Sequence, residues 1–140
     1  MHLLIYQERS DINAIVHTHS IYATSFAVVG KDIPPISGEG AALGGTIACA
    51  KYEAGGTREL GAAALEKLES RDAVLLRNHG VLAVGPSLKR AYFGANFVEN
   101  TARLFILGSI IGTPVPLPED VVQNTRQEFQ HSYFQAKKKD

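Results

Sequence analysis

The sequence predicts one mixed α/β domain that spans residues 1–140. Short runs of β-branched and other apolar residues, which are typical of strands, alternate with longer segments in which apolar residues recur at helical spacing. Glycine and proline residues separate these segments at short intervals, and no linker, repeat or low-complexity segment divides the chain. Residues 134–140, which end in three lysines and an aspartate, are expected to form a flexible, solvated tail.

The first third of the chain is predicted to fold as helix, strand and helix. Residues 1–7 are typical of a helix end, and the turn residues that follow lead into a β-branched strand at 12–16. A second helix begins after Ser20, a residue type that caps helices, and stops at Gly30. Residues 17–19 therefore lie at the junction between a strand and a helix.

The middle third is predicted to contain three short strands and a helix. Glycine-rich residues 38–45 break the regular pattern before a strand at 47–50. A helix follows at 57–68, where Thr57 is a suitable N-cap. Two apolar strands are then predicted at 73–77 and 81–84.

Two helices are predicted to complete the domain. Apolar residues recur at helical spacing from residue 87 to about residue 110, which makes this the longest helix. Glycine and proline residues at 112–116 end it. Pro118, followed by two acidic residues, starts a last helix that reaches roughly residue 133.

The composition excludes several classes of protein. Hydrophobic residues make up 45% of the chain and charged residues 20%, which is ordinary for a folded globular domain. The 14 basic side chains balance the 14 acidic ones, so no overall field attracts nucleic acid or an anionic membrane. One cysteine excludes an internal disulfide, and neither a signal peptide nor an apolar run of about 20 residues is found. We therefore expect a cytoplasmic protein.

Three histidines are candidate metal ligands. His17 and His19 project to the same side if the backbone is extended, although two histidines at this spacing are more often simply hydrogen-bonded polar residues. His79 also follows an apolar strand and precedes Gly80, and its alternative role is that of a buried structural histidine. Three neutral ring nitrogens are typical of a catalytic zinc site, which keeps a position open for water or substrate.

Longer motifs around these histidines resemble one known family. Tyr6 and residues 11–20 resemble the first metal-binding segment of the class II aldolase and adducin family. Residues 56–60 and 73–82 resemble the segment that carries the family's remaining histidine, and the order and separation of the motifs agree. The resemblance covers residues 1–119, and the pattern is most similar to that of the L-fuculose-phosphate aldolases.

This resemblance implies a fold, a cofactor and a reaction. The fold would be a central mixed, mainly antiparallel β-sheet flanked by helices in three layers, shortened at its N-terminus and assembled as a homotetramer. His17, His19 and His79 would hold one Zn²⁺ or another divalent ion per chain. A lyase of this kind cleaves a ketose 1-phosphate, such as fuculose 1-phosphate, to dihydroxyacetone phosphate and a short aldehyde through an enediolate. The partner would be a small sugar phosphate, with no nucleic acid or membrane involved.

The chain also departs from the family pattern. The family's acid/base glutamate would lie about three residues upstream of Met1, together with the loops that bind the substrate phosphate. Losing such a group costs about 10²- to 10⁴-fold in rate, so this chain alone is expected to be weakly active or inactive. Glu39 is a candidate substitute base, and its alternative role is that of a helix-start or surface carboxylate. Gly38 stands where fuculose-phosphate aldolases have a tyrosine.

The sequence is also compatible with other functions. A pentulose-phosphate 4-epimerase, or a dehydratase or decarboxylase of the same family, would use the same metal and differ in its substrate contacts. A non-catalytic metal-binding or scaffold module would fit the absence of the glutamate but would not need three histidines. Asn78, Tyr52 and Arg58 lie beside the motifs, and we assign them structural roles: turn formation, core packing and solvation of a helix start.

Overall fold

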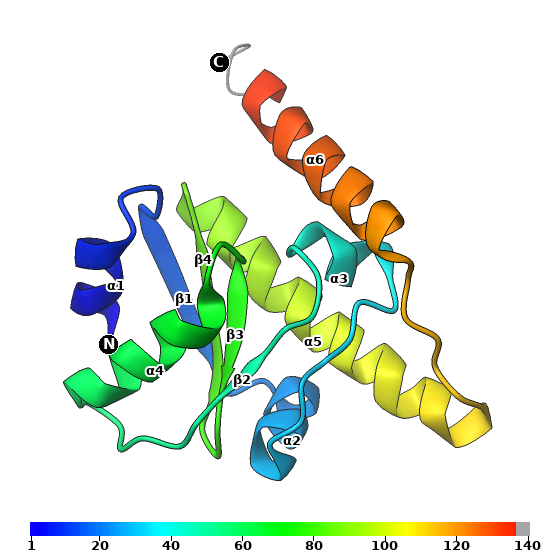
Figure 1. The fold of residues 1–140 in the computed structure, drawn as a ribbon, viewed down its shortest axis with the longest axis horizontal. Coiled ribbons are helices and arrows are strands. Elements are labelled where there is room, and N and C mark those ends of the chain that lie inside the picture. Colours follow the sequence, from blue (N-terminus) through cyan, green and yellow to red (C-terminus); the bar gives the residue numbers. More distant parts are fainter. Residues whose placement is uncertain (137–140) are drawn as a thin grey trace.

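The computed structural model of the chain describes residues 1–136 as helices packed around one small β-sheet (Figure 1). In chain order the elements are α1 (His2–Glu8), β1 (Ala14–Thr18), α2 (Ile21–Val29), α3 (Gly38–Ala42), β2 (Cys49–Ala50), α4 (Arg58–Leu68), β3 (Ala73–Leu76), β4 (Gly80–Gly85), α5 (Leu88–Ile111) and α6 (Glu119–Ala136). The predicted alternation of helices and strands is confirmed. No helix in this part of the chain is long and apolar enough to cross a membrane.

The sheet has four strands in the order β1-β4-β3-β2. β1 pairs antiparallel with β4, β4 pairs antiparallel with β3, and β3 pairs parallel with β2. The sheet is therefore mixed and mainly antiparallel, as expected. Thr18 at the end of β1 lies opposite Val81, and Leu76 lies opposite Gly80. This register brings the residues after β1 and the turn between β3 and β4 to the same end of the sheet.

Helices cover both faces of the sheet and give the fold its three layers (Figure 1). Because neighbouring residues of a strand face opposite sides, Val81 and Ala83 pack toward α2 and α5, whereas Leu82 and Val84 pack toward α1 and α4. Every residue of β3 and β4 is buried. Burial on both faces explains why these strands read as unbroken apolar runs in the sequence.

The largest difference from the predicted elements is α3. The glycine-rich stretch was expected to be irregular, but its first half is a helix because the Ser37 hydroxyl accepts a hydrogen bond from the Gly40 N–H at 3.2 Å. A Cβ on Gly40 would lie 3.0 Å from the Thr101 side chain, so this glycine allows α3 to approach α5 closely. The prediction of a break holds for Gly44 and Gly45, whose φ angles are +101° and +108°.

Several element boundaries also differ from the predicted ones. β1 lies at 14–18 instead of 12–16, because its pairing with β4 begins only at Ala14. β2 is reduced to two residues, and the preceding Ile47 forms an isolated bridge with Ile33. Thr57 caps α4 as predicted. α6 continues through residues 134–136, and the remainder of the predicted tail, 137–140, lies outside the described residues.

A buried charge cluster attaches α6 to the rest of the domain. The Asp72 carboxylate at the start of β3 accepts hydrogen bonds from Arg90 of α5 at 3.4 Å and from Arg126 of α6 at 3.3 Å. The Arg126 guanidinium also donates to the Ser70 carbonyl at 2.6 Å. Burial raises the pKa of Asp72, while the two arginines act in the opposite direction. One charged side chain of α6 therefore binds two groups beside β3.

Replacing Arg126 with methionine is expected to loosen α6. The aliphatic stem is retained, but the Ser70 carbonyl and one Asp72 oxygen lose their donor, which costs about 1–3 kcal/mol. Thermal unfolding gives the stability change, and amide hydrogen exchange should show the largest acceleration in α6. Gln127→Met, at an exposed position of the same helix, is the control. Equal exchange in the two variants would contradict this role for Arg126.

Candidate metal centre

His17 is held by the strand that pairs with its own. It lies in β1, is half-buried, and its Nδ1 lies 2.8 Å from the Val81 carbonyl oxygen of β4. Because a carbonyl only accepts, Nδ1–H is the donor, and the neutral imidazole keeps its lone pair on Nε2. A backbone hydrogen bond of this kind is the usual way in which proteins orient a metal-binding histidine.

His19 follows directly after β1 and presents its ring beside that of His17. The two Nε2 atoms are 3.1 Å apart, and the ring centroids are 4.9 Å apart. The His19 side chain is exposed, so the pair can be reached from solvent. The predicted projection of both imidazoles to one side is thus what the structure has.

His79 enters from the turn between β3 and β4. Asn78 has a left-handed backbone with φ +54°, a conformation that asparagine tolerates better than most residues, and this turns the chain so that His79 faces β1. The Asn78 N–H donates to the Ala27 carbonyl near the end of α2 at 3.1 Å, and the His79 N–H donates to Leu76 at 3.0 Å. The turn is therefore bound to both the sheet and α2.

Together the three imidazoles form a donor set for one metal ion. The ring centroids of His79 lie 4.8 Å from His17 and 5.0 Å from His19, and one ring nitrogen from each residue falls within 4.8 Å of the others. Zn–N distances of about 2.0–2.1 Å place two nitrogens on one tetrahedral ion roughly 3.3 Å apart, close to the His17–His19 separation. Burial, followed by the charges of His17 and His19, lowers the pKa of His79, which favours the neutral form that binds metals.

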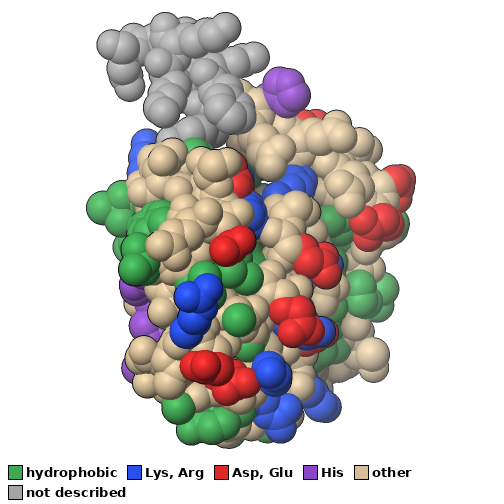
Figure 2. Space-filling model, turned by 60° about the vertical axis from the view of Figure 1, so that its left-hand side comes forward, with side chains coloured by type: hydrophobic (Ala, Val, Ile, Leu, Met, Phe, Trp, Pro, Cys, Tyr) green, Lys and Arg blue, Asp and Glu red, His purple; other side chains and the backbone are tan. Residues whose placement is uncertain are grey.

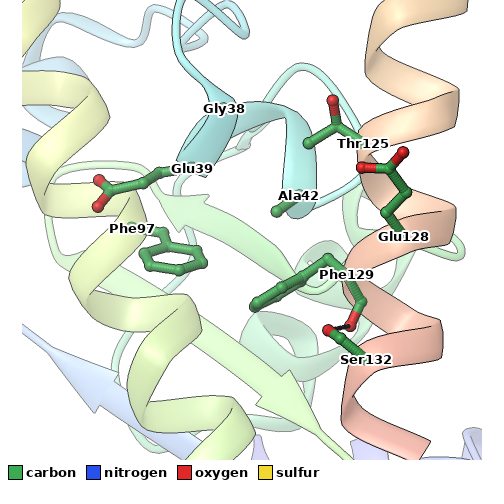
Figure 3. Close-up of a pocket in the computed structure, with 8 residues that line it drawn as sticks. All are labelled: Gly38, Glu39, Ala42, Phe97, Thr125, Glu128, Phe129 and Ser132. Atoms are coloured by element: carbon green, nitrogen blue, oxygen red, sulfur yellow. Dashed lines mark hydrogen bonds between the residues drawn. The ribbon is translucent and has the colours of Figure 1, made fainter. Parts of the chain in front are cut away.

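The described residues outside the three histidines add no carboxylate or thiolate to this group. Glu39 instead lines a pocket of about 450 Å³ between α3, α5 and α6, with Phe97 and Phe129 on its apolar walls (Figure 3). None of the three histidines lines that pocket, whereas Gly38 does. The structure thus does not bring Glu39 to the histidines.

Residues beside the motifs are placed as follows. Asn78 forms the turn, as expected. The expectation of core packing for Tyr52 is wrong, because its side chain is 63% exposed in the segment between β2 and α4.

Figure 2 shows histidine side chains gathered at one edge of the surface. His2 lies near enough to His17 for the charge of His17 to lower its pKa, after the larger effect of burial.

Sequence reasoning missed one group that supports the site. The Glu99 carboxylate of α5 accepts hydrogen bonds from the N–H groups of Tyr22 and Ala23, at the start of the helix that follows His19. Nothing in the sequence near Glu99 points to this contact, because 76 residues separate the carboxylate from Ala23. Only the packing of α2 against α5 creates it.

Comparison with known proteins agrees with the motifs. The profile of the family described as "Class II Aldolase and Adducin N-terminal domain" matches residues 1–106. The chain belongs to this family. Two curated relatives of this class II aldolase/adducin chain are similar over most of its length. A 5-deoxy-D-ribulose 1-phosphate aldolase from Bacillus thuringiensis is 42% identical to it over 130 residues. An L-fuculose phosphate aldolase from Escherichia coli is 39% identical to it over 120 residues.

Solved structures of the family share the fold. An L-fuculose 1-phosphate aldolase, 37% identical, superposes with a TM-score of 0.89 over 92% of the present chain and 61% of its own. A sugar-phosphate aldolase from Thermotoga maritima, 27% identical, gives a TM-score of 0.61 over 84% of the present chain and 54% of its own. The two curated relatives are matched over 93% and 85% of this chain, which spans 61% and 56% of their lengths.

Proposed function

We propose that this chain carries the metal-binding part of a metal-dependent sugar-phosphate aldolase. The observation that carries the proposal is the convergence of His17, His19 and His79, with His17 fixed in the tautomer that leaves Nε2 available. The curated relatives that span most of the chain are named as aldolases of L-fuculose phosphate and 5-deoxy-D-ribulose 1-phosphate. A ketose 1-phosphate is therefore the proposed class of substrate.

The proposed cleavage needs both a metal ion and protein side chains. A divalent ion, commonly zinc in this family, would supply Lewis-acid polarisation of the substrate carbonyl. Cleavage breaks the bond between C3 and C4: the C4 hydroxyl loses its proton and becomes the aldehyde, while C3 keeps the electron pair as an enediolate and then takes up a proton. The three imidazoles hold their nitrogens at fixed positions through the Val81 carbonyl and the β3–β4 turn. The proton transfers need an acid/base group, a role that the family resemblance gives to a glutamate.

Assembly and location extend the proposal. The family resemblance implies a homotetramer, and the exposed apolar side chains at the end of α5 support burial of this region in an assembly: Leu104, Leu107, Ile110 and Ile111 are 44–90% exposed. Sedimentation of the protein should give four times the mass of one chain. The half-buried Cys49 is a free thiol, which suits the reducing conditions of the cytoplasm.

The test is an aldol cleavage assay with L-fuculose 1-phosphate and 5-deoxy-D-ribulose 1-phosphate. Zinc-loaded protein is compared with chelator-treated protein and with the His79→Ala variant, and dihydroxyacetone phosphate is the measured product. Cleavage that is lost in both controls would establish the aldolase. Stoichiometric zinc without cleavage would indicate either an incomplete enzyme or a metal-binding module, and an epimerised sugar phosphate would indicate an epimerase.

A further inference from the structure

The start of α2 lacks the capping bond that its own sequence offers. Ser20 occupies the N-cap position, yet its side chain makes no capping hydrogen bond and accepts instead from the Thr18 hydroxyl at 3.4 Å. The Glu99 carboxylate takes over this function: Oε1 accepts from the Tyr22 N–H at 3.1 Å and Oε2 from the Ala23 N–H at 2.9 Å. These are the second and third residues of the helix, the positions that a capping side chain normally serves.

A carboxylate is well suited to this place. The free N–H groups at a helix start carry partial positive charge, and hydrogen bonds to an ionised acceptor are stronger than neutral ones. Glu99 is half-buried, and its neighbour on α5, Val98, belongs to the core, so the carboxylate is presented from a rigid helix. Arg103, one turn further along α5, lies 5.5 Å from the Tyr22 ring and contacts the same turn of α2.

α2 connects the two segments that carry the histidines. His19 is separated from its first residue by Ser20 alone, and near its other end the Ala27 carbonyl accepts from Asn78, the neighbour of His79. His19 itself is exposed, and its ring lies against the other two histidines and beside Gly80. The position of its backbone therefore depends on Thr18, which is paired with β4, and on the first turn of α2.

We propose that Glu99 is a positioning residue for the metal centre, which acts through α2 to hold His19 against His17 and His79. This inference rests on the proposed metal-binding function. Glu99 does not itself join the histidine group, so its effect is on the geometry of the ligands and not on their number. Removing an outer group that orients metal ligands typically lowers metal affinity by about 10- to 100-fold.

The decisive variant is Glu99→Gln, which keeps the size of the side chain but removes the charge and replaces one acceptor by a donor. Zn²⁺ affinity is measured by competition with a chromophoric chelator, well below the melting temperature. We expect affinity to fall by about 10- to 100-fold, with faster amide exchange at Tyr22 and Ala23. Adding Ser20→Asp, which supplies a local cap and restores the negative charge, is expected to recover both. Glu128→Gln, an exposed change on α6, is the control.

The outcomes separate this inference from the proposed function. Unchanged zinc affinity in Glu99→Gln, despite faster exchange at Tyr22, would overturn the positioning role. If the wild-type chain binds no zinc, the proposed function fails, and the metal-free proteins decide the role of Glu99. In that case, nuclear Overhauser contacts between the ring protons of His19 and His79 are compared in the metal-free wild type and the metal-free Glu99→Gln variant. Loss of these contacts in the variant supports the inference, and their retention overturns it.

Discussion

Replacing His79 with alanine is expected to lower zinc affinity by more than about 100-fold. Removing a group that only orients a metal ligand lowers affinity by about 10- to 100-fold, and His79→Ala removes a ligand itself. His79 supplies one of three ring nitrogens, and no carboxylate or thiolate among the described residues stands beside the group to replace it. The β3–β4 turn should still form, because Asn78 and the backbone bond from His79 to Leu76 are unchanged. The loss is therefore one of binding, not of folding.

Thermal unfolding with and without zinc measures this effect. At a zinc concentration about 100 times the dissociation constant, the wild-type chain gains about 2.7 kcal/mol, which corresponds to a rise in melting temperature of roughly 5–10 °C. The His79→Ala variant should show no such rise. His131→Ala is the matched control, because His131 is an exposed histidine on α6 whose Nδ1 lies 3.0 Å from the Gln127 carbonyl oxygen. A zinc-dependent rise in both variants would exclude His79 as a ligand.

The elements that bear the ligands were predictable because their signals are local. The spacing of His17 and His19 on extended backbone, and the position of His79 at the end of an apolar strand, are visible in a few consecutive residues. The sequence did not determine which strands are neighbours. The pairing of β1 with β4, which places His17 beside the β3–β4 turn, depends on contacts between residues more than 60 positions apart.

The errors share this origin. Glycines in α3 were interpreted as a break because glycine disfavours helices, whereas Gly40 is required for close packing against Thr101 of α5. Glu39 was a candidate substitute base, but it lies in the first turn of α3, which is its alternative role, and it lines the pocket between α3, α5 and α6. Glu99 was overlooked because its hydrogen bonds to α2 exist only in the folded chain. Local propensity predicts where helices and strands lie in the sequence, but only the packing of these elements determines which side chains surround the histidines.

Gly80 is the position where a single methyl group is expected to damage both fold and metal centre. It begins β4, directly after His79, and is buried. A Cβ at this residue would lie 2.3 Å from the Thr18 carbonyl oxygen and 2.9 Å from Cδ2 of His19. Neither the backbone of β1 nor the paired strand can yield without shifting the end of the sheet, so the close approach of the two strands requires glycine.

Gly80→Ala is accordingly expected to cost about 1–3 kcal/mol of stability, the range for overpacking a buried site. It should also weaken zinc binding by about 10- to 100-fold, because the displaced backbone carries His19 away from its partners. Gly55→Ala is the control, since nothing lies within 4 Å of its added methyl group. Chemical denaturation and zinc competition on the two variants give both quantities. If Gly80→Ala matches Gly55→Ala in stability and in zinc affinity, the close contact between β1 and β4 does not determine the geometry of the site.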